Sequence, residues 1–168
     1  MKKLLKMLIA AIVLLGFNIT ARAQELMPEV SVKSVNYKYI RSVMDTTAAE
    51  VVKTMQKMAA TYDIKNSEYY DDEYESYSVS MYIPQGQVLA VYDASGKLLR
   101  TAEKFTNVSL PPAVRNAVYN SFPDWVIARD VYLVNYTEEG MNEKMYKLLL
   151  QKGDQRKRIK TDEKGNFK

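Results

Sequence analysis

Hydrophobic and polar residues alternate along several stretches of this chain, and each of these stretches predicts a β-strand. The clearest is residues 77–83, where Tyr77, Val79 and Met81 alternate with serines. Further strands are expected at 88–92, 98–105, 126–136, 144–151 and 155–161, and an N-terminal strand with a bulge near 33–34 is expected at 30–43. Short turns separate most of these stretches, so the pattern predicts hairpins and an antiparallel sheet.

Two other stretches have apolar residues at helical spacing. Residues 47–50, with the sequence TAAE, fit a capping box, and an apolar stripe follows at Val51/Val52, Met55, Met58/Ala59 and Tyr62. Ser109 is the expected cap of the second helix, with Pro111 and Pro112 in its first turn. Each helix is expected to pack one face on the sheet. The methionines could line a binding groove, but their spacing favours the core.

A turn motif appears twice. Residues 93–96 (DASG) lie between two expected strands, and residues 162–165 (DEKG) repeat the motif near the end of the chain. We expect Gly96 at positive φ, and we expect Gly165, near a terminus, to tolerate alanine better. The order helix, strand, strand, strand then occurs twice. The fold class is therefore α+β, a single domain of two tandem units, 24–105 and 106–168, with helices packed on one antiparallel sheet.

The first 23 residues have the pattern of a cleaved export signal. Lys2, Lys3 and Lys6 precede an apolar run at 7–17, and Ala21 and Ala23 offer small residues before a cleavage site after Ala23. An uncleaved membrane anchor is the alternative, but the run is too short to span a bilayer. The expected mature chain, 24–168, is periplasmic or secreted and does not span a membrane.

Composition removes many kinds of chemistry. The four basic residues of the export signal account for the formal net charge of +4, so the mature chain is neutral and a nucleic-acid partner is not expected. The chain has no histidine and no cysteine, which excludes His-based triads, Cys-based redox sites and the usual zinc sites. We expect no catalytic residue, no metal and no cofactor. A carboxylate enzyme stays as an alternative, and it would need two acids about 5–9.5 Å apart in a cleft.

The segment 63–75 is acidic and rich in tyrosine, with six acidic residues against Lys65 alone. It could be a solvated connection or a contact surface, because tyrosine is favoured at the cores of protein interfaces. Tyr132 and Tyr136 could equally pack beneath the helices. The candidate partner-binding residues are Tyr69, Tyr70, Asp71, Asp72, Tyr74, Tyr77, Trp125, Tyr132 and Tyr136.

The last expected strand, 155–161, reads QRKRIKT and is basic. This charge could hold an anionic ligand. Lysine and arginine along an edge strand also prevent a sheet from pairing with other chains, and that interpretation is favoured.

Three pieces of sequence carry a family resemblance. VYDASGKLL at 91–99, LPPAVRNAV at 110–118 and FPDW at 122–125, followed by a tyrosine-rich strand, resemble the PepSY-like, beta-lactamase-inhibitor-like exported proteins of Bacteroidetes. The resemblance implies helices on an antiparallel sheet and non-catalytic binding through the exposed sheet face and loops. It also implies an association with secreted peptidases. The chain has no cysteine for disulfides, so inhibition of a beta-lactamase is not carried over.

The functional hypothesis is an exported, non-catalytic protein-binding module with an unknown protein partner. It would modulate a secreted or periplasmic enzyme such as a peptidase. The alternative is an envelope structural or assembly protein that acts through self-association or a membrane-associated complex.

Overall fold

From residue 50 onward, the helices and strands follow one another in the order that the sequence predicts. The structure, a computed structural model, describes residues 36–140 and 142–168, all within the unit Lys33–Lys168. Its elements are α2 (Tyr37–Val43), α3 (Glu50–Thr61), β1 (Ser76–Ile83), β2 (Gly86–Asp93), β3 (Leu98–Thr106), α4 (Pro112–Ser121), β4 (Val126–Thr137), β5 (Glu143–Lys152) and β6 (Gln155–Thr161). The expected export signal, 1–23, and the beginning of the expected N-terminal strand, 30–35, lie outside the described residues.

The strands form one six-stranded antiparallel sheet in the order β1-β2-β3-β4-β5-β6, so neighbours in the sheet are also neighbours in the sequence. This confirms the expected α+β fold. The pleat then decides which side chains are buried. In β1, Tyr77 and Met81 are buried, whereas Ser78 and Ser80 on the opposite face are exposed. No helix in the described part of the chain is long and apolar enough to cross a membrane.

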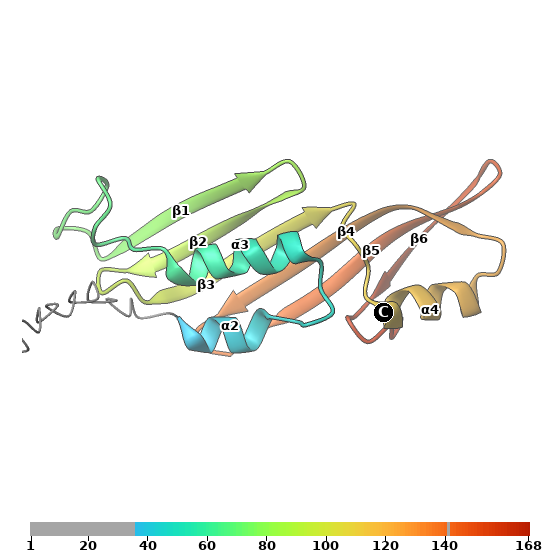
Figure 1. The fold of residues 1–168 in the computed structure, drawn as a ribbon, viewed down its shortest axis with the longest axis horizontal. Helices are drawn as coiled ribbons and strands as arrows, with labels where there is room; N and C mark the ends of the chain where they lie inside the picture. Colours follow the sequence, from blue (N-terminus) through green and yellow to red (C-terminus); the bar gives the residue numbers. More distant parts are fainter. Residues whose placement is uncertain (1–35, 141) are drawn as a thin grey trace, which may run out of the picture. The chain divides into compact units, whose positions relative to one another are not determined.

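All three described helices lie on one face of the sheet (Figure 1). Tyr92 of β2 reaches α3 and donates its hydroxyl to the carbonyl of Ala59 at 2.6 Å. Phe122, the residue that ends α4, lies under the side chain of Lys157 from β6, whose Nζ is 4.7 Å from the ring centroid. The core therefore lies between this face and the helices, and the opposite face has no helix over it in the described structure.

Residues 37–43 form a helix, so the N-terminal strand expected at 30–43 is wrong for this part. Tyr39 and Val43, four residues apart, are the buried residues of α2, which is helical spacing. Asn36 fixes the start of the helix: its Nδ2 donates to the carbonyl of Ala60 at 3.1 Å, and its Oδ1 accepts from the backbone N–H of Leu98 at 2.8 Å. The alternating tyrosines Tyr37 and Tyr39 suggested a strand, but in the helix Tyr39 faces the core and Tyr37 is exposed.

Neither expected helix cap forms. Ala49 is the N-cap of α3 and Pro111 is the N-cap of α4, and neither helix has a side-chain cap. Thr47 instead donates its backbone N–H and its hydroxyl to Asp45 in the turn before α3. Burial of an apolar stripe therefore fixes these helices, as is usual for short helices in proteins.

The two edge strands have opposite character. β1 has the sequence SYSVSMYI, without a charged residue, whereas β6 carries Arg156, Lys157, Arg158 and Lys160. Charge on an edge strand opposes pairing with another chain. The charge pattern protects β6 and leaves β1 unprotected.

Candidate binding surface

The face of the sheet opposite the helices, called the open face below, combines apolar and basic side chains. Its apolar residues that are at least partly exposed form a band across β2 to β5: Leu89, Ala102, Val131, Leu133, Met145 and Leu149. Its basic residues lie among and beside them: Arg100, Lys104, Arg129, Lys147, Arg156, Arg158 and Lys160. The described helices leave this face without a cover, and exposed surfaces with a contiguous group of apolar side chains mark interaction sites.

A shallow hollow of about 300 Å³ lies on the open face across β4, β5 and β6. Val131 and Leu149 supply aliphatic side chains to it, and Arg129, Lys147, Arg158 and Lys160 supply four cations. The register explains how these residues meet: Arg129 is opposite Leu149, and Leu149 is opposite Arg158. Alternation along three neighbouring strands therefore builds one site from residues far apart in the sequence.

The four cations of the hollow have no acidic partner among the described residues. The ion pairs among the described residues involve other side chains, such as Lys97 with Glu138 at 3.0 Å and Lys152 with Asp124 at 3.2 Å. Lys147 is directly opposite Lys160 on the neighbouring strand. Like charges at directly opposite positions of a sheet repel each other and cost stability. The hollow is therefore a concentrated and uncompensated positive site.

The acidic segment is held in place by its own tyrosines. Tyr77 is buried, Tyr70 stacks on it with the ring centroids 5.5 Å apart, and Tyr74 meets it edge-on at 6.4 Å. The hydroxyl of Tyr77 donates to the carbonyl of Asp71. Tyr77 therefore anchors the segment from the core.

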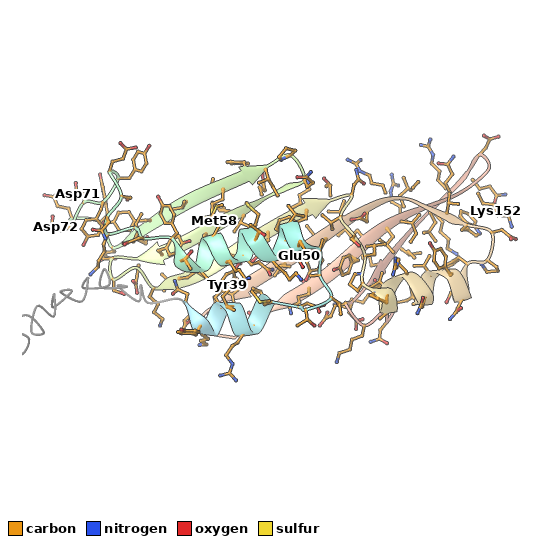
Figure 2. All side chains as sticks on the ribbon, viewed as in Figure 1. Tyr39, Glu50, Met58, Asp71, Asp72 and Lys152 are labelled. Carbon is orange, nitrogen blue, oxygen red and sulfur yellow. The ribbon has the colours of Figure 1, made fainter. Side chains whose placement is uncertain are left out.

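The outer residues of the acidic segment face solvent. Tyr69 is 72% exposed, and Asp71 and Asp72 are also exposed. Figure 2 shows Asp71 and Asp72 at one end of the sheet and Lys152, in β5, at the other. Tyr74 is also 60% exposed, so the candidates of this segment that a partner could reach are Tyr69, Asp71, Asp72 and Tyr74.

Tyr132 and Tyr136 are in the core, so the expectation that they contact a partner is corrected. They are 0% and 1% exposed. Tyr132 stacks on Tyr146 with the centroids 4.2 Å apart, and Tyr136 meets Tyr39 edge-on at 5.1 Å. Both tyrosines belong to the phase of β4 that faces the helices. Burial accordingly raises the pKa of both hydroxyls. Trp125, just before β4, is half-buried and packs against the same core.

A buried carboxylate lies beneath α2 and α3. Glu103 of β3 accepts hydrogen bonds from the Tyr39 hydroxyl at 2.6 Å, the Thr101 hydroxyl at 2.9 Å and Gln56 Nε2 at 2.9 Å. Burial raises the pKa of Glu103, and these hydrogen bonds with the charge of Lys144 oppose the rise only in part. The carboxylate joins two helices to the sheet and is closed off from solvent, which suits a structural role.

The carboxylates at the surface are held in turns and ion pairs. Glu143, Asp162 and Glu163 border a hollow with Lys144 and Lys168. Asp162 accepts the backbone N–H groups of Lys164 and Asn166, each at 2.9 Å, in its own turn. Within the described ranges, no group of three or more acidic side chains is placed to hold a metal ion.

Arg129 and Lys147, the basic residues of the open face on β4 and β5, are not among the binding residues expected from the sequence. Both lie in stretches that were recognised as strands, at positions that alternate with buried residues. That alternation was a usable signal. The missing information was the register, which brings Arg129 and Lys147 beside the basic residues of β6.

Comparison with known proteins gives few matches. No family model matches the sequence, and no curated protein matches it. A BLIP-like protein from Bacteroides fragilis has a similar solved structure, with a TM-score of 0.35 and 21% identity over 56% of this chain and 66% of that one, slightly under two thirds of its length. A DUF2874 family protein from Bacteroides ovatus is similar with a TM-score of 0.34 and 17% identity, over 74% of this chain and 86% of that one.

Proposed function

We propose that this chain is an exported, non-catalytic module that binds a protein through the open face of its sheet. The observation that carries the proposal is a sheet face that no described helix covers and that carries apolar and basic side chains, because such a face offers area to bury and charges to select a partner. The open face has a fixed shape because the helices pack against the other face of the sheet. Export to the periplasm or the cell exterior, with cleavage after Ala23, is part of the proposal.

The partner in this proposal is a secreted or periplasmic enzyme, and a peptidase is the class that the family resemblance implies. A module of this kind would act by occupying a surface of the enzyme. The buried position of Glu103 and the structural use of Asp162 support a role without catalysis.

Site-specific photo-crosslinking tests the proposed surface. A photoreactive residue at Leu89, which is 41% exposed on the open face, is expected to give one discrete crosslinked product in intact cells. The matched control is Met58, which is 48% exposed on α3 and lies on the helix side (Figure 2). The proposal fails if Met58 gives the same product, or if Leu89 gives none. The N-terminal residue of the purified protein, expected to be Gln24, tests export by mass spectrometry.

Self-association as an envelope assembly protein is the second candidate, and the uncharged edge strand β1 favours it. Its eight residues include no charge, proline or glycine that would oppose pairing with a second copy. Sedimentation velocity over a range of concentrations separates the two candidates. The binding module stays monomeric without its partner, whereas the assembly protein forms larger species that a lysine in place of Ser78 or Ser80 suppresses.

A further inference from the structure

The charge of the open face exceeds what the protection of an edge strand requires. Arg156, Arg158 and Lys160 lie on β6, at the edge, where they oppose pairing with other chains. Lys147 lies on β5, the strand next to the edge strand, and Arg129 lies on β4, two strands from the edge. Cations on interior strands do not oppose pairing at the edge of the sheet, so the basic residues of the hollow need another explanation.

The repulsion within the hollow indicates the charge of its ligand. Lys147 is opposite Lys160, and Arg158 lies two residues before Lys160 on the same face. No acidic group of the described chain compensates them. Negative charge brought by a ligand would remove a repulsion that the free protein carries, and this gain adds to the direct attraction.

The shape and floor of the hollow indicate the class of ligand. Val131 and Leu149 lie between the cations, so a ligand that covers the site brings apolar groups as well as anionic ones. A free phosphate or sulfate has only the anionic part. A peptide in extended conformation points every second side chain to the same side, with the same period as the strands beneath it. A segment with acidic and apolar residues in turn at every second position can therefore present both kinds of group to the hollow.

We infer that the hollow on β4, β5 and β6 binds an acidic peptide segment of the partner protein. Carboxylates of the segment pair with Arg129, Lys147, Arg158 and Lys160, and an apolar side chain of the segment covers Val131 and Leu149. This inference rests on the proposed function and adds the chemistry of the partner's contact segment. A narrow peptide reaches the floor of a hollow, whereas a membrane surface would meet only the side chains around it.

Fluorescence anisotropy with synthetic peptides tests the inference. The probe is a labelled octapeptide in which every second residue is glutamate or leucine in turn, with serine between them, and the control peptide has glutamine in place of every glutamate. The purified chain is expected to bind the acidic peptide at least tenfold more tightly than the control. Binding should weaken from 50 to 300 mM salt, because screening reduces attraction between exposed charges.

A single substitution separates binding from folding. Lys147→Glu is expected to weaken binding of the acidic peptide at least tenfold. The same change should leave the melting temperature equal or higher, because it replaces repulsion with Lys160 by attraction. Lys57→Glu, an exposed position on α3, makes the same change in net charge and should leave peptide binding within twofold of the starting chain.

Three results would overturn the inference. One is equal binding of the acidic and neutral peptides. A second is co-sedimentation with phosphatidylglycerol vesicles in the absence of peptide binding, which would identify a lipid surface as the ligand. The third is self-association abolished by Asp71→Asn and Asp72→Asn, which would identify the acidic segment of a second copy. Leu89 lies outside the hollow. Absence of the Leu89 crosslink would therefore contradict the proposed function, whereas a Leu89 crosslink without peptide binding would contradict only this inference.

Discussion

The turn before β3 and the turn after β6 share their hydrogen bonds but differ in their surroundings. In the first, Asp93 Oδ1 accepts the backbone N–H groups of Ser95 at 2.8 Å and Lys97 at 3.0 Å. In the second, Asp162 Oδ1 accepts those of Lys164 and Asn166 at 2.9 Å. The glycines that follow have φ values of 86° and 84°. The positive φ expected at Gly96 is therefore confirmed.

The tertiary contacts of the two turns are not alike. A Cβ added at Gly96 would meet only Ile64, at 3.8 Å, whereas one added at Gly165 would lie 2.7 Å from the carbonyl oxygen of Ala113 and 2.9 Å from Ala117 Cβ. α4 therefore closes over the second turn. The C-terminus is also held in place, since Phe167 packs edge-on against Phe122 with the centroids 5.7 Å apart. The expectation that Gly165 tolerates alanine better than Gly96 is contradicted by these contacts, because closeness to a terminus does not leave Gly165 without close neighbours. Local sequence specifies a turn, but its neighbours set the cost of changing it.

Two buried threonines, one in β3 and one in β6, differ in a similar way. Thr101 of β3 donates its hydroxyl to the buried carboxylate of Glu103. Thr161 of β6 is equally buried, yet its hydroxyl has no hydrogen-bond partner within the described residues. The Thr101 hydroxyl thus has a partner in the cluster around Glu103, although Gln56 Oε1 of that cluster has none among the described residues, whereas the hydroxyl of Thr161 has no partner there at all.

The largest expected effect is that of Gly165→Ala. Positive φ and close contact with α4 both oppose a side chain, and together they should lower the free energy of unfolding by about 2–4 kcal/mol. Urea denaturation measures it. A loss equal to that of Gly96→Ala would show that α4 moves away from the turn without cost.

The next effect is that of Thr101→Val. It removes a hydrogen bond to a charged group and leaves Glu103 with one donor fewer, which should cost about 2 kcal/mol. The measurement is again urea denaturation, with Thr101→Ser as the control that retains the hydroxyl. If both variants were equally destabilised, the missing hydroxyl would not be the cause.

Gly96→Ala is expected to cost about 1 kcal/mol, from positive φ alone. The side chain has room, so Gly96→Asn, a residue that tolerates this conformation, should recover most of the loss. No recovery would indicate a steric cost that the open surroundings of Gly96 do not suggest.

Thr161→Val should have the smallest effect of these substitutions. It replaces an unsatisfied buried hydroxyl by a methyl group of the same shape, so the free energy of unfolding should change by less than about 0.5 kcal/mol or should increase. A clear loss of stability would mean that the hydroxyl has a partner.

The dependence of stability on pH should differ between a buried carboxylate, Glu103, and a carboxylate in a turn, Asp93. The pKa of Glu103 is raised by burial, so the folded chain holds this proton more tightly than the unfolded chain, and stability should decrease as pH rises through the raised pKa. Burial raises the pKa of Asp93, but hydrogen bonds from Ser95 and Lys97 outweigh it and lower the pKa overall, so its contribution is lost as pH falls. Thermal unfolding between pH 3 and 8 measures both. Glu103→Gln should flatten the profile on the neutral side only, and Asp93→Asn on the acidic side only.

The strands and the turns were predictable from the sequence because their signals are local. Alternation at Tyr77 to Ile83 and the motif ending at Gly96 specify conformation within a few residues. Helix α2 was missed because seven residues are too few to separate a helical period from alternation. The caps at Thr47 and Ser109 were wrong because packing, not capping, fixes where these helices begin.

The candidate surface was less predictable, for a different physical reason. Alternation shows that a strand has two faces, but it does not show which face the helices cover. Tyr132 and Tyr136 were candidates for this reason, and Val131 and Leu133 on the other phase of β4 are the residues of the open face. Arg129 and Lys147 were missed because their meeting depends on strand register, which is a property of pairs of strands.

The order of strands in the sheet also has a consequence for folding kinetics. Each strand pairs with the one that follows it in the chain, and only the step from β3 to β4 encloses a helix. Contacts between residues near in sequence need little loop closure, and proteins dominated by such contacts fold fast for their size. The sheet can therefore grow strand by strand from β1, and no strand has to wait for a partner from a distant part of the chain.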